Sequence, residues 1–221
     1  MLDQLGSPRG VVFDMDGTLL ESERLARACF LAACADVGWP DVDIAVYNQC
    51  VGATFARTRE ILLAGYGAGF PVDEMEAHWS RRYHSHIDHH ALDIKPGIVQ
   101  LLETLHAQQI PIALATSSRR PTALKKLERA GLLHFFQTMV CGGEVSQGKP
   151  HPEPYIKAVE EIVRRPDECW ALEDSDSGVR SAFAAGLQVI QIPDELAPSP
   201  EVQGLGHVIL ADATPLAGLL S

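Results

Sequence analysis

Apolar residues along the chain occur either in short unbroken runs or at helical spacing, and the two patterns predict different elements. Short runs flanked by glycine, proline and polar residues are typical of buried strands. Such runs predict strands at residues 11–13, 111–115, 138–141, 169–172 and 189–192, and a weaker one at 207–210. Apolar residues that recur every three to four positions predict helices at residues 98–105, 119–130, 154–165 and 177–185, and a short helix at the C-terminal end.

Residues 19–92 show only the helical pattern. A long helix is expected over residues 19–37, and glycines and prolines separate it from the helices that follow. Those further helices are expected at about 42–50, 54–64 and 73–90. This block therefore predicts an all-helical unit that comes after the first strand.

The order of the predicted elements indicates the fold class. Strands that alternate with helices form right-handed βαβ units, and such units make a mainly parallel sheet with helices on both faces. We therefore predict an α/β protein with a Rossmann-like core made of residues 1–18 and 93–221. Residues 19–92 would form a helical domain inserted into this core. In such sheets the ligand site lies at the carboxyl ends of the strands.

The length and charge of the chain limit its domain organisation and the kinds of partner it is expected to bind. A chain of 221 residues suits one core with a sizeable insertion and is long enough to fold without metal or disulfide crosslinks. Its 18 basic and 29 acidic residues give a formal net charge of −11. So acidic a chain is not expected to have nucleic acid or an anionic membrane as a partner. The same charge would oppose an anionic substrate unless a cation intervenes.

The cysteines and the N-terminal residues indicate the cellular compartment in which the protein is expected. The five cysteines are odd in number, widely spaced and outside any metal-binding pattern, so reduced thiols in a cytoplasmic protein are expected. The N-terminal residues lack the basic and apolar segments of a signal peptide, and no apolar run is long enough to span a membrane. The sequence does not distinguish a monomer from a small homo-oligomer.

Reactive side chains gather where the predicted strands end. Two acids follow the first strand, two more follow the fourth, a hydroxyl pair follows the second, and a lysine lies in a loop between them. These residues are Asp14, Asp16, Thr116, Ser117, Lys149, Glu173 and Asp174. Because the carboxyl ends of parallel strands share one edge of the sheet, we expect them to form one site. Its carboxylates suit Mg²⁺, a hard cation, and its lysine and hydroxyls suit a phosphate.

These motifs resemble those of a known enzyme family. Residues 14–19, Asp-Met-Asp-Gly-Thr-Leu, are similar to the first motif of the haloacid dehalogenase (HAD) superfamily. Thr116, Lys149-Pro150 and Glu173-Asp174 resemble its second, third and fourth motifs, in the same order. The resemblance covers nearly the whole chain, because the helical insertion looks like the family's C1-type cap. Within the superfamily the chain most resembles the β-phosphoglucomutase-like sugar phosphatases, which share the K-P-x-P-x-x-Y pattern found at 149–155.

The resemblance implies a role for each side chain in phosphoryl transfer. Asp14 would attack phosphorus and form an aspartyl phosphate. Asp16 would protonate the leaving oxygen and then take a proton from the attacking water. Lys149 would neutralise charge on the nucleophile and the phosphoryl oxygens, and the Thr116 hydroxyl and the Ser117 amide would bind those oxygens.

The resemblance also implies a magnesium ion. Asp14, the main-chain carbonyl of Asp16 and Asp174 would bind it, with Glu173 as a ligand either directly or through water. Gly17 would let the backbone turn tightly around the metal and the phosphate. The ion would offset the repulsion between carboxylates and phosphate, which reconciles an acidic chain with an anionic substrate.

The predicted activity is Mg²⁺-dependent hydrolysis of a small phosphomonoester, a sugar phosphate or a related metabolite. Dehalogenation is disfavoured, because a halide leaving group needs no acid at the position of Asp16. A phosphomutase is a second hypothesis, but the arginine and the histidine that mark the mutase are replaced by Phe55 and Ala26. Arg57 or Arg59 would be left to bind a second anion. A non-catalytic phosphate-binding module is a third hypothesis, although the intact acidic pair favours turnover.

The resemblance implies that the inserted helices close over the site and choose the substrate. Hinges are predicted at residues 19–21 and 91–95, and the turn at 51–53 is predicted to meet the substrate. In this arrangement the core carries out the chemistry and the cap sets the specificity.

Two further patterns have plainer explanations. Residues 143–149 nearly spell a phosphate-binding loop of the Walker A type, but Pro150 stands where that loop needs a serine or threonine. The run from His84 to His90 places His86 and His90 four residues apart, a spacing that can bind metal. At the end of a polar helix such a run is more often a solvated face.

Overall fold

The computed structural model describes residues 5–51, 53 and 55–220 of the chain, apart from the side chain of Phe55. Its strands are β1 (Gly10–Phe13), β2 (Ile112–Arg119), β3 (Thr138–Gly142), β4 (Cys169–Glu173), β5 (Gln188–Gln191) and β6 (Val208–Ile209). Its helices are α1 (Glu23–Asp36), α2 (Ile44–Asn48), α3 (Phe55–Tyr66), α4 (Val72–Ile87), α5 (Ile98–Ala107), α6 (Arg120–Arg129), α7 (Glu153–Glu161), α8 (Asp176–Ala184), α9 (Pro200–Gln203) and α10 (Thr214–Gly218). Two short 3-10 turns lie at Leu133–Phe135 and Pro166–Glu168.

The strands form one parallel sheet in the order β3-β2-β1-β4-β5-β6. In its middle, Val12 of β1 is level with Ala113 of β2 and with Ala171 of β4. The strand order reverses next to β1, because β2 and β3 extend to one side of it and β4, β5 and β6 to the other. Such a reversal is where α/β sheets bind ligands. The predicted α/β fold with a Rossmann-like parallel sheet is confirmed.

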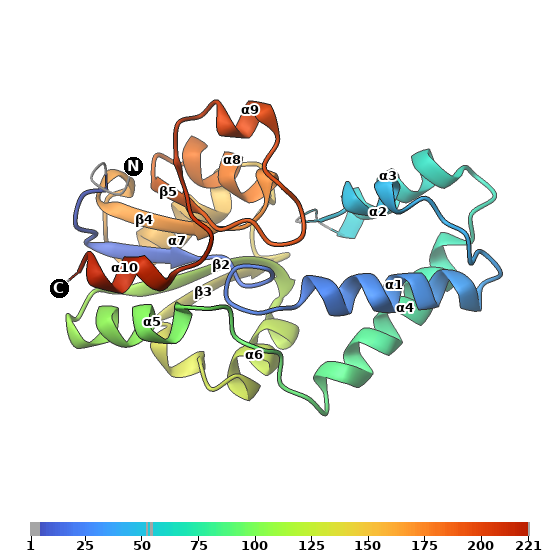
Figure 1. The fold of residues 1–221 in the computed structure, drawn as a ribbon, viewed down its shortest axis with the longest axis horizontal. Coiled ribbons are helices and arrows are strands. Elements are labelled where there is room, and N and C mark those ends of the chain that lie inside the picture. The colour runs from blue at the N-terminus through green and yellow to red at the C-terminus, as the bar shows by residue number, and fades with distance from the viewer. Residues whose placement is uncertain (1–4, 52, 54, 221) are drawn as a thin grey trace.

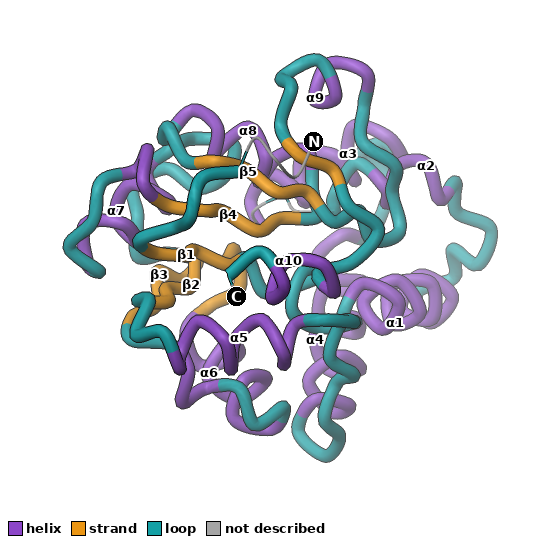
Figure 2. The backbone as a smooth tube through the Cα atoms, turned by 60° about the vertical axis from the view of Figure 1, so that its left-hand side comes forward, coloured by secondary structure: helices purple, strands orange, loops and turns teal. Residues whose placement is uncertain are grey.

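Each strand sends alternate side chains to opposite faces of the sheet, because the side-chain period of a strand is two. Val11 and Phe13 point into a hydrophobic core beneath α5, α6 and α10, whereas Val12 points into a second core beneath α7, α8 and α9. The largest buried side chain is Trp170 in the first core and Tyr155 in the second. Figure 2 shows the sheet between these two helical layers.

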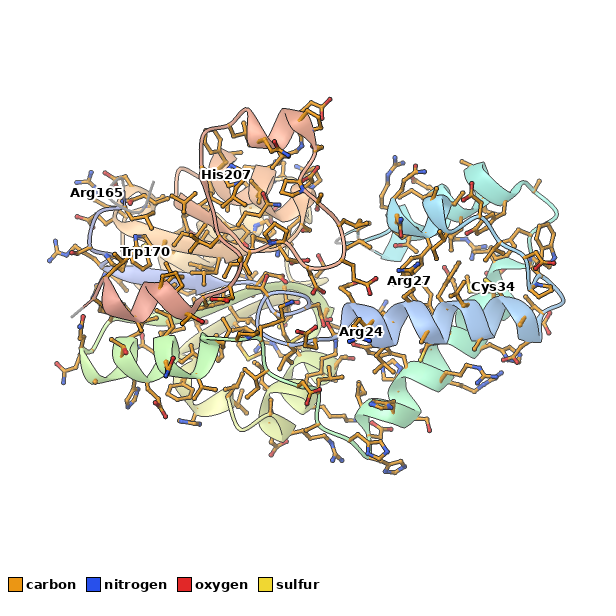
Figure 3. All side chains as sticks on the ribbon, viewed as in Figure 1. Arg24, Arg27, Cys34, Arg165, Trp170 and His207 are labelled. Carbon is orange, nitrogen blue, oxygen red and sulfur yellow. The ribbon has the colours of Figure 1, made fainter. Side chains whose placement is uncertain are left out.

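Helices α1, α2, α3 and α4 form a separate helical unit beyond the edge of the sheet where β1 ends (Figure 1). No strand lies between α1 and α4 in the described part of the chain. The unit has its own hydrophobic core, in which Phe30 packs against Tyr47 and Trp79. An ion pair connects it to the sheet-bearing part, with 3.4 Å between Nη1 of Arg27 on α1 and Oε2 of Glu195 in the loop after β5. Figure 3 labels Arg27 on this helix.

Two chain segments connect the helical unit to the sheet, and they pair with each other. The amide of Glu21 donates to the carbonyl of Asp93, and the amide of Lys95 donates to the carbonyl of Leu19. An antiparallel bridge lies between these two bonds. The expectation that the first helix begins at residue 19 is therefore wrong, because residues before Glu23 belong to this paired connection.

Two other element boundaries differ from the predicted ones. β2 does not end at Ala115 but continues to Arg119, with a break in its register to β3 after Ala115. The helix predicted over residues 154–165 ends early, because the chain turns at Val163, which has a φ of 55°. Helix α9 was not predicted, since a four-residue helix is too short to show a period.

The cysteines pack as small apolar residues. Cys141 and Cys169 lie in the two cores of the sheet, and Cys34 and Cys50 lie in the core of the helical unit. These four and Cys29 are buried and free of disulfide bonds, as predicted. None of the described helices is long and apolar enough to cross a membrane.

Candidate active site

The side chains singled out at the strand ends converge on one region. β1 and β4 are neighbours in the sheet, so the acids that follow them come together, and β2 adds its hydroxyl pair from the other side of β1. A small cavity of about 30 Å³ is lined by Asp14, Asp16, Thr116, Ser117, Lys149 and Asp174, together with Glu23 and Ser175. Glu173 and Gly17, which were also predicted, contact these lining residues from outside the cavity.

Lys149 is a buried cation on this cavity. Its Nζ donates to Asp14 Oδ1 at 2.6 Å and to Glu173 Oε1 at 2.5 Å, and its side chain is 2% exposed. Although burial disfavours its charge, the two carboxylates raise the pKa of Lys149 above its usual range. Lys149 is therefore charged at neutral pH and can neutralise both Asp14 and an anion beside it.

Both oxygens of Glu173 already have hydrogen-bond partners. Oε1 accepts from Lys149 and, at 2.8 Å, from the hydroxyl of Tyr155, the last residue of the 149–155 pattern. Oε2 accepts from the amide of Asp174 at 3.2 Å and from the amide and hydroxyl of Ser175 at 3.3 and 3.1 Å. The carboxylate lies against Gly178, where a Cβ atom would be 1.8 Å from Oε1. Glu173 is thus fixed in place and in turn positions Lys149.

Asp14, Glu173 and Asp174 form a buried acidic cluster, in which one oxygen of each lies within 4.8 Å of the others. Burial raises the pKa of Asp14 to about 7; Lys149 opposes this shift, and Glu173 and Asp16 add to it. The pKa of Asp174 is also raised, by burial and by its acidic neighbours. Carboxylates held this close repel one another unless a proton or a cation lies between them. Their oxygens are hard ligands, so the acidic cluster fits a divalent cation.

The main chain turns tightly beside Asp174. Gly17 has a φ of 82°, and a Cβ atom there would lie 2.5 Å from Asp174 Oδ2. Thr18 donates from its hydroxyl to Asp174 Oδ1 at 3.1 Å. Position 17 therefore requires glycine on two grounds, the backbone conformation and the space that this carboxylate occupies.

Asp16 lies in a different environment from Asp14. Its Oδ1 accepts from Ser22 Oγ and Lys126 Nζ, both at 2.6 Å, and its Oδ2 accepts from Ser118 Oγ at 2.7 Å. Burial would raise its pKa, but these three donors outweigh burial and hold the pKa of Asp16 below its usual value. Its side chain is not one of the three clustered carboxylates, so a metal ligand from Asp16 would be its main-chain carbonyl.

Lys126 on α6 is the main site residue that the sequence patterns did not indicate. Its side chain is 2% exposed, and its Nζ lies 4.8 Å from the centroid of the Tyr83 ring. Together with Lys125 it looks like a solvated charge pair in the sequence. Ala123, Lys126 and Leu127 nevertheless form the buried face of α6. A lysine at an apolar position of an amphipathic helix was the available signal. The serine donors to Asp16 were missed because serine is an ordinary helix-start residue.

A large cavity of about 310 Å³ extends from the site into the helical unit. It shares Asp16, Glu23 and Ser117 with the small cavity, so the two adjoin. Its other walls come from α1, α2, α3 and α4 and from Ser118 and Lys126 of the sheet-bearing part. A molecule with a reacting group in the small cavity would therefore hold the rest of its structure in the large one.

The two hydroxyl residues of β2, Thr116 and Ser117, differ in burial and in hydrogen bonding. The Oγ1 of Thr116 accepts from the amide of Ser118 at 3.1 Å, and the residue is buried. Ser117 is partly exposed and lines both cavities. Both therefore lie on the wall of the small cavity, in the irregular part of β2.

The features predicted for the helical unit can be located against the large cavity. Val51 and Ala53 line it, whereas Gly52 between them and the side chain of Phe55 lie outside the described residues. Ala26 also lines it. The described lining includes neither Arg57 nor Arg59.

The histidine run and the Walker-like loop do not form sites of their own. The run covers the end of α4 and the residues after it, and His84 lines the large cavity. The rings of His86 and His90 lie 4.9 Å apart, but no group of three metal-ligating side chains among the described residues includes them. Lys149 of the Walker-like loop points to carboxylates, and a helix begins only at Glu153.

Comparison with known proteins gives relatives of similar length. A model of the family described as haloacid dehalogenase-like hydrolase matches residues 11–192. A phosphorylated carbohydrates phosphatase from Thermotoga maritima is 30% identical over 183 residues, covering 81% of this chain and 82% of that protein. A validoxylamine A 7'-phosphate phosphatase from Streptomyces hygroscopicus subsp. limoneus is 30% identical over 176 residues, covering 80% and 81%. Among solved structures, a variant of CbbY from Rhodobacter sphaeroides in complex with xylulose-(1,5)bisphosphate has a TM-score of 0.78 at 26% identity, covering 95% of this chain and 96% of that chain.

Proposed function

The chain belongs to the haloacid dehalogenase-like hydrolases, and from this we propose that it is a phosphatase of a small phosphomonoester, a sugar phosphate or a related metabolite. The observation that carries the proposal is the convergence of Asp14, Asp16 and Lys149 on a small cavity that adjoins a large one. The small cavity holds the groups for phosphoryl transfer. The large one has room for the organic part of the ester.

In the proposed reaction Asp14 attacks phosphorus, the bond to the leaving oxygen breaks, and an aspartyl phosphate forms. Asp16 gives its proton to the departing oxygen, so the leaving group departs as an alcohol. Water then attacks the aspartyl phosphate, Asp16 takes the proton of that water, and inorganic phosphate leaves Asp14. Three donors hold the pKa of Asp16 below its usual value, so Asp16 must take up a proton as the substrate binds. The negative charge of the phosphate favours that uptake.

Lys149, Thr116 and Ser117 serve the phosphoryl group in this proposal. Lys149 contacts Asp14 and carries the positive charge that offsets the approach of an anion to a carboxylate. Thr116 and Ser117 line the same cavity, where the hydroxyl of one and the amide of the other can donate to phosphoryl oxygens. Donors fixed in advance around developing charge are a large source of catalysis.

We propose Mg²⁺ as the divalent cation of the acidic cluster. Asp14, Asp174 and the main-chain carbonyl of Asp16 would hold it. Glu173, whose oxygens already accept hydrogen bonds, would act through water and through Lys149. When bound, such an ion offsets the repulsion between carboxylates and phosphate and polarises the phosphoryl oxygens.

We propose that residues 19–92 are a cap domain on a core of residues 1–18 and 93–221. The separate hydrophobic core of the helical unit and the pairing of its two connections support this division. The connections at residues 19–21 and 91–95 would be the hinges. Closure would exclude water from the two cavities while the leaving group departs.

The proposed partner is a small phosphorylated metabolite, and not nucleic acid or a membrane. A net charge of −11 supports this, because it repels polyanions but leaves a small phosphate to the cation and Lys149. We propose a cytoplasmic location, since five buried free thiols are typical of a reducing compartment. A monomer and a small homo-oligomer are both compatible with this activity.

Two other functions receive less support. A mutase needs a histidine where Ala26 lines the large cavity and a cation for a second phosphate, and Arg57 and Arg59 are not in the described lining. A non-catalytic module would not need the three donors that orient Asp16 beside Asp14. We therefore place hydrolysis first.

A phosphate-release assay over many phosphorylated metabolites, with Mg²⁺ present, tests the proposal. Release from a sugar phosphate or a related monoester supports it. Conversion of β-glucose 1-phosphate to glucose 6-phosphate without net release would identify a mutase instead. Binding of Mg²⁺ and phosphate with no turnover of any compound would identify a binding module.

A further inference from the structure

The large cavity has an aromatic wall that comes from the helical unit. Tyr47 of α2 and Trp79 and Tyr83 of α4 line it. Trp79 is held in place, since its Nε1 donates to the carbonyl of Ala26 at 2.9 Å and its ring packs edge-on against Phe30. Rigid aromatic walls bind the apolar face of a ring and leave its polar groups to be recognised by a few side chains.

Acidic groups outnumber basic groups in the described lining of this cavity. Glu23, Glu76 and Asp16 line it, and Lys126 is the one lysine or arginine. Burial raises the pKa of Glu23 to about 8, so this acid is largely uncharged at neutral pH. Lys126 is bound to Asp16 at 2.6 Å, so its charge is already balanced. Away from the small cavity, the described wall therefore presents carboxylates and no unpaired lysine or arginine.

Glu76 of α4 differs from the other two acids in having a buried oxygen that no described residue donates to. Its side chain is 10% exposed, and its Oε1 is buried without a hydrogen-bond partner among the described residues. Its Oε2 lies 3.5 Å from Arg59 Nη1, which is closer to Asp73, at 2.5 Å. Burial raises the pKa of Glu76, with Arg59 opposing the shift. A buried acceptor without a donor is destabilising unless a ligand supplies the donor.

The arginines of α3 do not offset this negative wall. Arg59 is paired with Asp73 and Glu76, and Arg57 pairs with Glu60 at 2.8 Å. A second phosphate held in the large cavity would therefore lie against carboxylates. Like charges that face each other across a binding site disfavour the partner that carries them.

On the basis of the proposed phosphatase function, we propose that Glu76 selects the substrate by accepting a hydrogen bond from a hydroxyl or a protonated amine of the leaving group. The substrate class is a phosphomonoester with one phosphate and a ring that carries such donors, an amino sugar above others. A protonated amine gains most, because a charge-assisted hydrogen bond is stronger than a neutral one. A second phosphate is disfavoured because it would lie against Glu76, and the described lining offers it no unpaired lysine or arginine.

Three glucose derivatives that differ by one group test this selection: glucosamine 6-phosphate, glucose 6-phosphate and glucose 1,6-bisphosphate. We expect kcat/KM to fall in that order, with the bisphosphate about tenfold or more below glucose 6-phosphate. A protein that hydrolyses the bisphosphate as well as glucose 6-phosphate overturns the inference. 4-Nitrophenyl phosphate distinguishes this from failure of the proposed function, because a protein that is no phosphatase would release phosphate from none of the four.

Glu76→Gln removes the charge and keeps the size of the side chain. We expect it to lower the kcat/KM ratio of glucosamine 6-phosphate to glucose 6-phosphate by about five- to tenfold, and to raise that of the bisphosphate to glucose 6-phosphate. Glu74→Gln, exposed on the same helix, should leave both ratios unchanged. Ratios in Glu76→Gln that equal those of Glu74→Gln overturn the role of Glu76. If circular dichroism shows that Glu76→Gln does not fold, the substrate order of the unmodified protein still decides the inference.

Discussion

The small and large cavities differ in how their buried charges are balanced. Beside the small cavity, a buried lysine lies against each acid of the predicted pair: Lys149 contacts Asp14, and Lys126 contacts Asp16. In the wall of the large cavity, Glu76 keeps an oxygen that no described residue donates to. One region is assembled in advance for a fixed reaction. The other would be completed by a substrate that donates to Glu76, as proposed above.

From this difference we expect residues of the small cavity to determine turnover and residues of the large cavity to determine which substrate is preferred. Five carboxyl groups and two lysines surround the small cavity, and the excess of negative charge is what a divalent cation would balance. These residues are Asp14, Asp16, Glu23, Glu173, Asp174, Lys126 and Lys149. In the proposed reaction they act on the phosphoryl group, which every substrate shares. Variants there should change turnover of all substrates alike, whereas variants in the helical wall should change the ratio between substrates.

Asp14→Asn gives the largest expected effect and the first test of this separation. An amide is not a nucleophile, so kcat should fall by at least about a thousandfold for every substrate. Asparagine keeps the size of aspartate and can still accept from Lys149, so the fold should be retained. Phosphate release from two unlike substrates, with thermal unfolding as the control, checks this. A loss for only one of the two substrates would mean that Asp14 selects the substrate. The proposed difference between the two cavities would then be wrong.

The acidic cluster gives the second prediction, a dependence of stability on pH and Mg²⁺. The pKa of Asp14 is raised from 3.8 to about 7, so the folded state binds its proton more tightly than the unfolded state does. This contribution to the free energy of unfolding is complete below about pH 4 and is lost as the pH rises to about 7. Without metal, the contribution of Asp14 to the stability of the protein should therefore be smallest above neutral pH.

Mg²⁺ should reverse that loss, and thermal unfolding at two pH values measures it. At about 100 times its Kd, Mg²⁺ adds roughly 2.7 kcal/mol, or about 5–10 °C in Tm, at pH 8. At pH 5.5 the increase should be smaller, because the cation must displace protons. The same Tm increase at both pH values would mean that the cation binds elsewhere.

The small cavity could be predicted from the sequence because most of its residues follow strands. A strand end fixes where the next side chain lies, and neighbouring parallel strands share an edge, so finding the strands brought Asp14, Thr116 and Asp174 together. Lys126 could not be placed in this way. It reaches the site from a helix, and its position depends on the rotation of α6 against the sheet. Because Lys126 directly follows Lys125, the sequence suggests two exposed lysines.

The helical unit was predicted in outline but not in detail. Helical periodicity and the absence of strand patterns located it, but its first helix begins at Glu23 because the residues before it pair with the second connection. That pairing joins residues far apart in the sequence, so no local pattern reveals it. The unpaired oxygen of Glu76 has the same origin, since it depends on how α4 packs against α1 and α3.

Lys126 lies on the border between the two cavities. The third prediction therefore tests whether it affects turnover or substrate selection. Lys126→Met keeps an apolar stem against Tyr83 but removes the charge that faces Asp16, which retains its two serine donors. We expect kcat to fall about 10- to 100-fold for all substrates. Lys125→Met is the matched control, because its partly exposed ion pair with Asp88 should affect activity less than about twofold. If substrate ratios change more than kcat does, Lys126 belongs with Glu76 in selection.

The smallest predicted effect lies at the connection between the two regions. Lys95 Nζ is 2.5 Å from Asp194 Oδ1 and 3.5 Å from Glu21 Oε1, and its side chain is 11% exposed. Asp194 Oδ2 is buried and has no partner among the described residues, so Lys95 is the main compensation for this carboxylate. Lys95→Met should therefore cost about 1–2 kcal/mol, roughly 3–6 °C in Tm, and should lower kcat by about two- to fivefold.

The control for Lys95 is an ion pair of similar length at the surface. Arg165 Nη2 is 2.6 Å from Asp167 Oδ2, but both side chains are mostly exposed, so Arg165→Gln should leave Tm nearly unchanged. Because Lys95 contacts neither cavity wall directly, its loss should slow all substrates equally. A changed substrate ratio in Lys95→Met would mean that the position of the helical unit, and not only the residues of its wall, sets selectivity. Turnover and selection would then share one structural origin, the contact between helical unit and sheet.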